Sequence, residues 1–376
     1  MSSAFIIENV VSQRLDIPFS EPIRMSFGTL DRLNLLLVRL TDNSGLEGIG
    51  ETTVMGGPYW GGESIEAVQA AIDKYLRPQI MGISYGGVED FSNQLSRLVR
   101  GNASARSALE MAAFDLVGKR TGLSAGSLLG GQCRSKLPVA WTLSTGSEKG
   151  DIEEGDRAIQ ARGHSRFKLK FGVGKADDEL SRIASIAEAF RGRASIILDI
   201  NQGWDLSSAL RYFPLLEEVG IECIEQPLPS ADHQGAARLR NSTSMEIIAD
   251  EALVDLRSAF EVARYGAASA VSLKPTRDGG LLAAKRISYV ASAAGMKIYG
   301  GTALESSLGT AASAHLYASL PEIHLGTELF GPLRLQADIV KNPLLPRDGL
   351  LEVPQGHGLG MVLDEDLVRT LRYTGG

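Results

Sequence analysis

Four short apolar segments between residues 196 and 275 decide the fold: IILDIN (196–201), IECIEQ (221–226), IIADE (247–251) and AVSLKP (270–275). Each of them carries a charged residue near its end, in turn Asp199, Glu225, Asp250 and Lys274. These four residues follow one another at intervals of 26, 25 and 24 positions. A strand, a turn, a helix of about ten to fifteen residues and a return loop need that much chain. The spacing therefore predicts a repeated strand–helix unit with parallel strands.

Further segments of the same kind lie on both sides of this stretch: Val139–Thr142, Phe167–Phe171, Lys297–Gly301 and His324–Phe330. With them the predicted strands number eight. Eight strand–helix units close into a (β/α) barrel, which occupies about 250 residues in a typical case. We therefore expect an α/β fold in which residues 133–335 form a barrel.

The residues before the barrel follow a different pattern. Extended segments are expected at 5–11, 33–41 and 46–51, and helical periodicity follows at 64–76, 88–100 and 103–121. This order predicts an N-terminal α+β capping domain over residues 1–132. The tail at 336–376 is rich in proline and glycine, and we expect it to return to the capping domain.

Composition indicates which kinds of protein and which binding partners are not expected for this chain. The 376 residues carry 38 Lys+Arg against 45 Asp+Glu, a net charge of −7 that disfavours nucleic acid as a partner. The first residues include Glu8 and Asp16 and contain no long apolar run, so neither a secretory signal nor a membrane span is expected. Two cysteines, Cys133 and Cys223, are too few for a disulfide framework. A cytoplasmic location is the expectation.

The charged strand ends predict a metal site. Strand ends on one rim of a barrel converge on the site of chemistry. Asp199, Glu225 and Asp250 on three adjacent strands would repel one another unless a cation neutralised them. Carboxylate oxygens suit a hard divalent ion, so we expect Mg²⁺ or Mn²⁺.

Lysines flank this expected ion on both sides. Lys168 and Lys170 alternate along one strand and therefore share its inward face, and Lys274 ends a strand on the other side. Partial burial and a nearby metal ion both favour the neutral amine, which lowers the pKa of a lysine toward neutrality. The predicted chemistry is proton transfer at the carbon next to a carboxylate, with an enolate stabilised by the metal.

Ordered motifs along the chain carry a resemblance to a known family. FKLKFG, LDINQGW, IEQPL, IADEAL, SLKPTRDGG and GTELFGPL resemble the muconate-lactonizing subgroup of the enolase superfamily, and the likeness spans essentially the whole chain. The resemblance implies an enolase-type barrel with a capping domain completed by the C-terminal tail. It also implies a metal-dependent cycloisomerase that converts cis,cis-muconate or a substituted muconate, a small dicarboxylate, into a muconolactone. Homo-oligomers are typical of the family.

The same resemblance implies roles for individual residues. Its metal ligands are Asp199, Glu225 and Asp250. Lys170 is then the acid or base on one face of the substrate and Lys274 lies on the opposite face, while Lys168 supports the substrate carboxylate. Glu328 matches the position of a proton donor, although it could equally be a carboxylate that balances the lysines.

Three further residues are candidates for substrate binding: Asn201, Tyr59 and Trp60. Asn201 and Glu251 resemble residues that support the metal ligands. Tyr59 and Trp60, in a glycine-rich loop, either close over the substrate or are ordinary surface aromatic residues.

Alternatives remain open at this stage. The same two lysines and metal would serve a racemase or epimerase of N-substituted amino acids, or a dehydratase, and an inherited fold could also act as a non-catalytic binding protein. A mandelate-racemase-type site is disfavoured, because it needs a histidine where the chain reads Gly300-Gly301-Thr302. Pro275 and Arg277 depart from the muconate pattern and could reshape the pocket.

Overall fold

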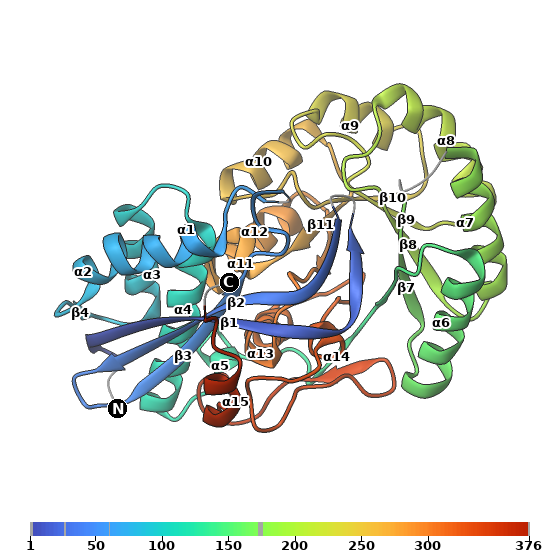
Figure 1. Ribbon diagram of the computed structural model, residues 1–376. Coiled ribbons are helices and arrows are strands. Elements are labelled where there is room, and N and C mark those ends of the chain that lie inside the picture. The colour runs from blue at the N-terminus through green and yellow to red at the C-terminus, as the bar shows by residue number, and fades with distance from the viewer. Residues whose placement is uncertain (1–2, 26–27, 60, 172–175, 375–376) are drawn as a thin grey trace.

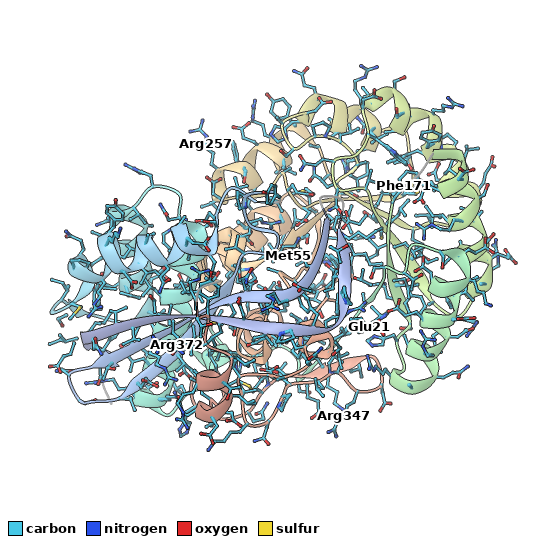
Figure 2. The ribbon with its side chains drawn as sticks, in the orientation of Figure 1. Glu21, Met55, Phe171, Arg257, Arg347 and Arg372 are labelled. Atoms are coloured by element: carbon cyan, nitrogen blue, oxygen red, sulfur yellow. The ribbon has the colours of Figure 1, made fainter. Side chains whose placement is uncertain are left out.

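The N-terminal part of the chain builds an antiparallel sheet. The computed structural model describes residues 3–25, 28–59, 61–171 and 176–374. The sheet has the order β3-β2-β1-β4, with β1 (Phe5–Met25), β2 (Gly28–Asp42), β3 (Glu47–Thr53) and β4 (Ser84–Tyr85). The first expected strand is longer than predicted, because β1 keeps pairing with β2 as far as Met25 opposite Gly28. The β1–β2 hairpin reaches from this sheet toward the rest of the molecule (Figure 1), and Glu21 lies on that side (Figure 2).

Helices cover one face of the antiparallel sheet. The helices of this part of the chain are η1 (Gly57–Tyr59), α1 (Ile65–Ala70), η2 (Ala71–Leu76), α2 (Arg77–Ile80), α3 (Val88–Leu98), α4 (Ala103–Thr121) and α5 (Ala125–Leu128), of which α1 and α4 pack against β2. Helix α4 lies directly on β3, because Gly48 and Gly50 have no side chains: a Cβ on Gly48 would stand 2.2 Å from the Ala112 carbonyl oxygen. This separate α+β domain confirms the predicted fold class of the N-terminal part.

A curled parallel sheet of seven strands forms the second part (Figure 1). The strands neighbour one another in chain order: β6 (Trp141–Leu143), β7 (Arg166–Lys170), β8 (Ser195–Asp199), β9 (Cys223–Glu225), β10 (Glu246–Ala249), β11 (Ala270–Leu273) and β12 (Lys297–Gly300). All neighbouring pairs are parallel. Seven of the eight predicted strands are thereby confirmed.

The eighth predicted strand, at 324–330, is wrong as a strand. Only Thr327 takes part in pairing there, through single parallel bridges to Val139 and to Gly300. The chain turns at Gly326, whose φ is +74°, and returns to helix at α14, so no run of extended residues is left to pair. Thr327 therefore links the end of β12 to the segment just before β6.

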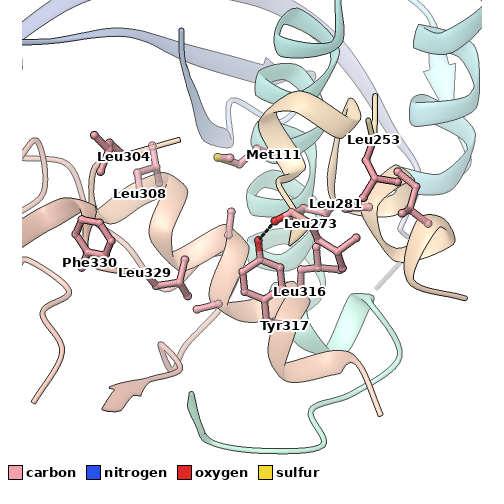
Figure 3. Close-up of a cluster of buried hydrophobic side chains, with 14 of the residues drawn as sticks. Met111, Leu253, Leu273, Leu281, Leu304, Leu308, Leu316, Tyr317, Leu329 and Phe330 are labelled. Atoms are coloured by element: carbon pink, nitrogen blue, oxygen red, sulfur yellow. Dashed lines mark hydrogen bonds between the residues drawn. The ribbon is translucent and has the colours of Figure 1, made fainter. Parts of the chain in front are cut away.

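Helices cover the outer face of the parallel sheet (Figure 1). They are α6 (Glu148–Arg162), α7 (Ala176–Phe190), α8 (Leu206–Glu218), α9 (His233–Arg240), α10 (Leu256–Tyr265), α12 (Leu281–Ala293) and α13 (Ser307–Ser319). The one-turn helices α11 (Pro275–Asp278) and α14 (Gly331–Arg334) lie instead at the carboxyl ends of the strands. Helix α13 is buried along its whole length. Its Tyr317 packs among leucines (Figure 3), and the Tyr317 hydroxyl donates a hydrogen bond of 2.6 Å to the Leu273 carbonyl. This contact anchors the end of β11, which precedes Lys274.

The tail contacts both parts of the molecule. Strand β13 (Leu350–Glu352) pairs with β5 (Lys136–Pro138), and α15 (Glu365–Thr370) follows it. Near the end of the chain Leu15 forms a bridge with Arg372, and the Tyr373 amide donates to the Arg14 carbonyl. The tail thus returns to β1. In the part of the chain that the structure describes, no helix has the length and apolarity needed to cross a membrane.

Candidate active site

One cavity gathers most of the residues predicted for the site. It has about 600 Å³ of empty space, including its open mouth, and lies at the carboxyl ends of the parallel strands. Its charged and amide side chains are Lys168, Lys170, Asp199, Asn201, Asp250, Lys274, Glu328 and Arg334. Its apolar wall consists of Ile23, Met55, Leu304 and Phe330. The wall includes residues from the β1–β2 hairpin and from the loop after β3, so the N-terminal domain covers part of the cavity.

Lys168 lies at the centre of a buried charge cluster. It is placed on β7 with its side chain pointing inward, and only 4% of that side chain is exposed. Its Nζ stands 3.1 Å from Asp199, 3.0 Å from Glu225 and 3.1 Å from Glu328. Burial opposes the charge, but the three carboxylates outweigh it and raise the pKa of Lys168 well above its usual value. Lys168 is therefore an ammonium group at neutral pH.

Lys170 lies two residues further along β7, at the pocket. Its Nζ donates hydrogen bonds of 2.5 Å to Asp199 Oδ2 and 2.8 Å to Asn201 Oδ1. The Asn201 amide in turn donates to Glu251 Oε1 at 3.2 Å. Asn201 can turn toward Lys170 because its backbone adopts a left-handed conformation, with φ +44°. Asn201 and Glu251 thus hold Lys170 in place, whereas the support of the metal ligands expected from them stays a prediction.

Lys274 follows β11 on the other side of the cluster. Its Nζ is 2.6 Å from Asp250 Oδ2, and Arg277 contacts the other oxygen of the same carboxylate. Burial opposes the charge on Lys274, but the carboxylates of Asp250 and Glu225 outweigh it and raise its pKa. Lys168 and Lys274 each have a carboxylate partner within 3.1 Å, and the lowering of lysine pKa values expected beside a bound metal ion stays a prediction.

The pKa values of the carboxyl groups in this cluster shift in different directions. Burial raises the pKa of Glu225 well above its usual range, and neighbouring Asp199 and Asp250 add to the effect although Lys168 opposes it. For Asp250 burial is outweighed by Lys274 and Arg277, which hold its pKa far below the usual value. Burial, with Asp250 and Asp199, raises the pKa of Glu251 to about 7. The site therefore holds more buried carboxyl groups than it has lysine ammonium groups to pair with them.

The remaining predicted residues lie in different places. Glu328 follows the Thr327 bridge and contacts Lys168, an arrangement that suits a carboxylate balancing a lysine. Tyr59 is 83% exposed and lines a neighbouring cavity, which shares Met55 with the candidate site. Trp60 lies outside the described residues.

Comparison with known protein families matches almost the whole chain. Residues 7–130 match the model for the mandelate racemase/muconate lactonizing enzyme N-terminal domain. Residues 151–367, more than half of the chain, match the model for the enolase C-terminal domain-like family. The chain belongs to the mandelate racemase/muconate lactonizing enzyme family of the enolase superfamily. The resemblance seen in its motifs is thereby confirmed.

Its relatives in this superfamily include muconate enzymes. A chloromuconate cycloisomerase from Cupriavidus necator is 40% identical over 363 residues, which cover 96% of this chain and 98% of the relative. Muconate cycloisomerase 1-1 from Acinetobacter lwoffii is 40% identical over 372 residues, 99% of this chain and 97% of the relative. The crystal structure of muconate lactonizing enzyme from Pseudomonas fluorescens in complex with muconolactone has a TM-score of 0.96 at 39% identity, covering 98% of this chain and all of that one.

Enolase-superfamily members depend on a divalent metal ion, and the donor set of this chain fits one. Glu225 Oε2 is buried and has no hydrogen-bond partner, although Lys168 Nζ lies 3.0 Å away as an ion pair. Asp199 and Asp250, on the strands to either side, add buried carboxylate oxygens. As the side chains stand, no three acidic, histidine or cysteine residues within the described ranges are arranged to hold an ion. Lysines contact each of these carboxylates.

Three features of the candidate site were not predicted from the sequence. Arg277 was noticed only as a departure from the muconate pattern, yet it binds Asp250. Thr142 lies in β6 and Ser144 directly follows it; both line the cavity, and their place at a strand end was a usable signal. Phe330 lies two residues after Glu328, and the sequence offered no sign that this buried core residue also lines the cavity.

Proposed function

We propose that this chain is a divalent-metal-dependent cycloisomerase, which converts cis,cis-muconate or a substituted muconate into a muconolactone through an enolate. The observation that carries the proposal is the pair Lys170 and Lys274, which line one cavity from either side of the carboxylates of Asp199 and Asp250. Relatives at about 40% identity over nearly the whole chain are named for this reaction.

In this proposal Asp199, Glu225 and Asp250 hold Mg²⁺ or Mn²⁺. Once bound, such an ion would supply positive charge that stabilises negative charge developing on a substrate carboxylate. Three carboxylates suit oxygen ligation of this kind. Lys168 and Lys274, both protonated, add positive charge around the same carboxylate.

The chemical step needs one proton, and Lys170 is the donor. One carboxylate oxygen of the substrate forms a C–O bond to an alkene carbon, and the displaced electron pair becomes the enolate of the other carboxylate. Lys170 Nζ then gives its proton to the adjacent carbon, and the amine recovers a proton from water. The dianion therefore takes up one proton for each lactone formed. Asn201 keeps Lys170 oriented during this step.

The test follows the ultraviolet absorbance of muconate with purified protein and Mn²⁺. We expect absorbance to decay together with the uptake of one proton per turnover, read by a pH indicator. The Lys170→Ala variant should lose about 100-fold or more of the rate, because general-acid catalysis contributes at least that much. Lys297→Ala is the matched control, since Lys297 pairs with Glu246 at the other end of β12 and should retain the rate.

Decay no faster than in a metal-free sample would contradict the proposal. Exchange of solvent deuterium into the α-carbon of an N-acylamino acid would then favour the racemase or epimerase alternative, because opposed lysines suit inversion.

Several broader expectations belong to the same proposal. The single-residue bridges of Thr327 support a parallel sheet that closes into an enolase-type barrel. We assign residues 1–132 to the capping domain, 133–335 to the barrel and 336–376 to a segment that returns to the cap, supported by the contacts of the tail with β1. A small-molecule dicarboxylate as substrate, a homo-oligomer and a cytoplasmic location remain predictions.

A further inference from the structure

Arg277 donates four hydrogen bonds beside the candidate metal ligand Asp250. It belongs to the one-turn helix α11, which Pro275 opens at its first position. Its Nη1 donates to both Oδ1 and the backbone carbonyl of Asp250, the latter at 2.8 Å. Its Nη2 donates to the Ser272 carbonyl at 2.6 Å, and its Nε donates to Asp278 Oδ1 at 2.9 Å.

These bonds tie together the ends of two neighbouring strands. Asp250 directly follows β10, and Ser272 lies in β11, so one guanidinium spans the two strand ends. Asp278 completes a closed circuit, because its Oδ2 accepts from the backbone amide of Lys274 at 2.9 Å. Arg277 therefore fixes a candidate metal ligand and the base of a candidate catalytic lysine at the same time.

The two oxygens of Asp250 have different partners. Oδ1 is bound by Arg277, whose charge persists at every accessible pH, whereas Oδ2 is bound by Lys274 at 2.6 Å. A carboxylate anchored at one oxygen and at its own backbone carbonyl has little freedom to rotate. Arginine can do this because its planar guanidinium carries five donors in a fixed arrangement, whereas a lysine could satisfy only part of the set.

We infer that Arg277 is a positioning residue, which holds Asp250 so that its Oδ2 is presented to the divalent ion of the proposed function. The inference rests on that function, since it takes Asp250 as a metal ligand. Partners that orient metal ligands typically contribute 10- to 100-fold to metal affinity or activity. Arg277 itself touches neither the substrate nor the reacting atoms.

Direct measurement of Mn²⁺ binding tests the inference without reference to turnover. Free Mn²⁺ is titrated by its paramagnetic resonance signal in the presence of the full-length protein. We expect Arg277→Met to weaken Mn²⁺ binding by about 10-fold or more. Arg277→Lys should give an intermediate affinity, because the positive charge remains while two of the three donor nitrogens are lost. Apparent affinity for muconate at saturating Mn²⁺ should change less than the affinity for the metal.

A control variant separates positioning from general stability. Arg120 is 26% exposed and pairs with fully buried Asp42 in the N-terminal domain, much as Arg277, 21% exposed, pairs with Asp250. Arg120→Met should lower the stability of the fold without changing Mn²⁺ affinity. If Arg277→Met fails to fold, Arg277→Lys carries the test.

The possible results are distinct. Equal Mn²⁺ affinity in wild type, Arg277→Met and Arg277→Lys would overturn the inference while leaving the proposed function intact. Tighter binding by Arg277→Met would also overturn it, because Arg277 would then compete with the ion rather than position its ligand. Failure of the wild type to bind Mn²⁺ would instead contradict the proposed function itself.

Discussion

Lys168 illustrates how single side chains set the charge of the pocket. Its ammonium contacts three carboxylates, and almost none of its side chain reaches solvent. A buried charge that loses its partner is strongly destabilising, because it can neither regain water nor find another ion. At this scale the candidate catalytic cluster also contributes to the stability of the fold.

Replacing Lys168 should therefore cost stability. We expect Lys168→Met to lower the free energy of unfolding of the metal-free protein by about 3–5 kcal/mol, as breaking a buried ion pair does. Added Mn²⁺ should recover part of this loss, because the ion supplies the missing positive charge. Urea unfolding with EDTA and with Mn²⁺ measures both effects. Lys136→Met, which removes an exposed pair with Glu352, should cost less than about 1 kcal/mol, and an equal loss in both variants would contradict this account.

At the scale of elements, acidic side chains of the N-terminal domain cap helices around the parallel sheet. Glu51 of β3 accepts hydrogen bonds from the backbone amide, at 2.8 Å, and the hydroxyl of Ser306, which begins α13. Glu110 of α4 likewise accepts from the Leu282 amide at 3.0 Å in the first turn of α12. Helix N-termini carry unpaired amides and a partial positive charge, so these carboxyl groups hold the domains together.

The Glu51 contact predicts a pH dependence of stability. Burial, reinforced by Asp338 and Glu305, raises the pKa of Glu51 to about 8, although its bonds to Ser306 oppose the shift. Between the unfolded value near 4.5 and 8 the folded state therefore binds more protons than the unfolded state. The contribution of Glu51 is fully present below pH 4.5 and is lost as the pH rises through 8.

Glu51→Gln should remove this dependence while keeping an acceptor for Ser306. Between pH 5 and pH 8.5 the free energy of unfolding should fall more steeply for the wild type than for the variant, by at least about 1 kcal/mol in the difference. Chemical unfolding at a series of pH values measures it, with Glu352→Gln, an exposed carboxylate, as the control. Parallel profiles for wild type and Glu51→Gln would show that Glu51 does not titrate as described.

The sequence was sufficient for some elements and insufficient for others, for physical reasons. Four apolar segments with charged ends 24 to 26 residues apart, together with similar segments on both sides, predicted the seven parallel strands. They also predicted the meeting of Asp199, Glu225 and Asp250, because parallel strands end on one rim. The eighth segment has similar composition but turns at Gly326, and composition does not report a turn of that kind. The role of Arg277 depends on where a one-turn helix aims one side chain, which no periodicity encodes.

For the whole molecule, metal binding should appear as a change in stability. An ion that binds only the native state stabilises it by about 2.7 kcal/mol at 100 times its Kd. We expect Mn²⁺ to raise the thermal midpoint and EDTA to reverse the rise. The variant Asp199→Asn with Asp250→Asn should show no shift, and an undiminished shift in that variant would place the ion elsewhere. Differential scanning calorimetry of the full chain measures all three.

Thr327 has a consequence for how the protein is made. Its hydroxyl donates to the Pro138 carbonyl 189 positions earlier, and Glu328 beside it contacts Lys168 160 positions earlier. Contacts so distant along the chain carry a large loop-closure entropy and form late in folding. A nascent chain that ends at β12 can pair its strands in order. It lacks both the bridges made by Thr327 and the carboxylate of Glu328. The pocket thus assembles near the end of synthesis, when almost nine-tenths of the polypeptide already exists.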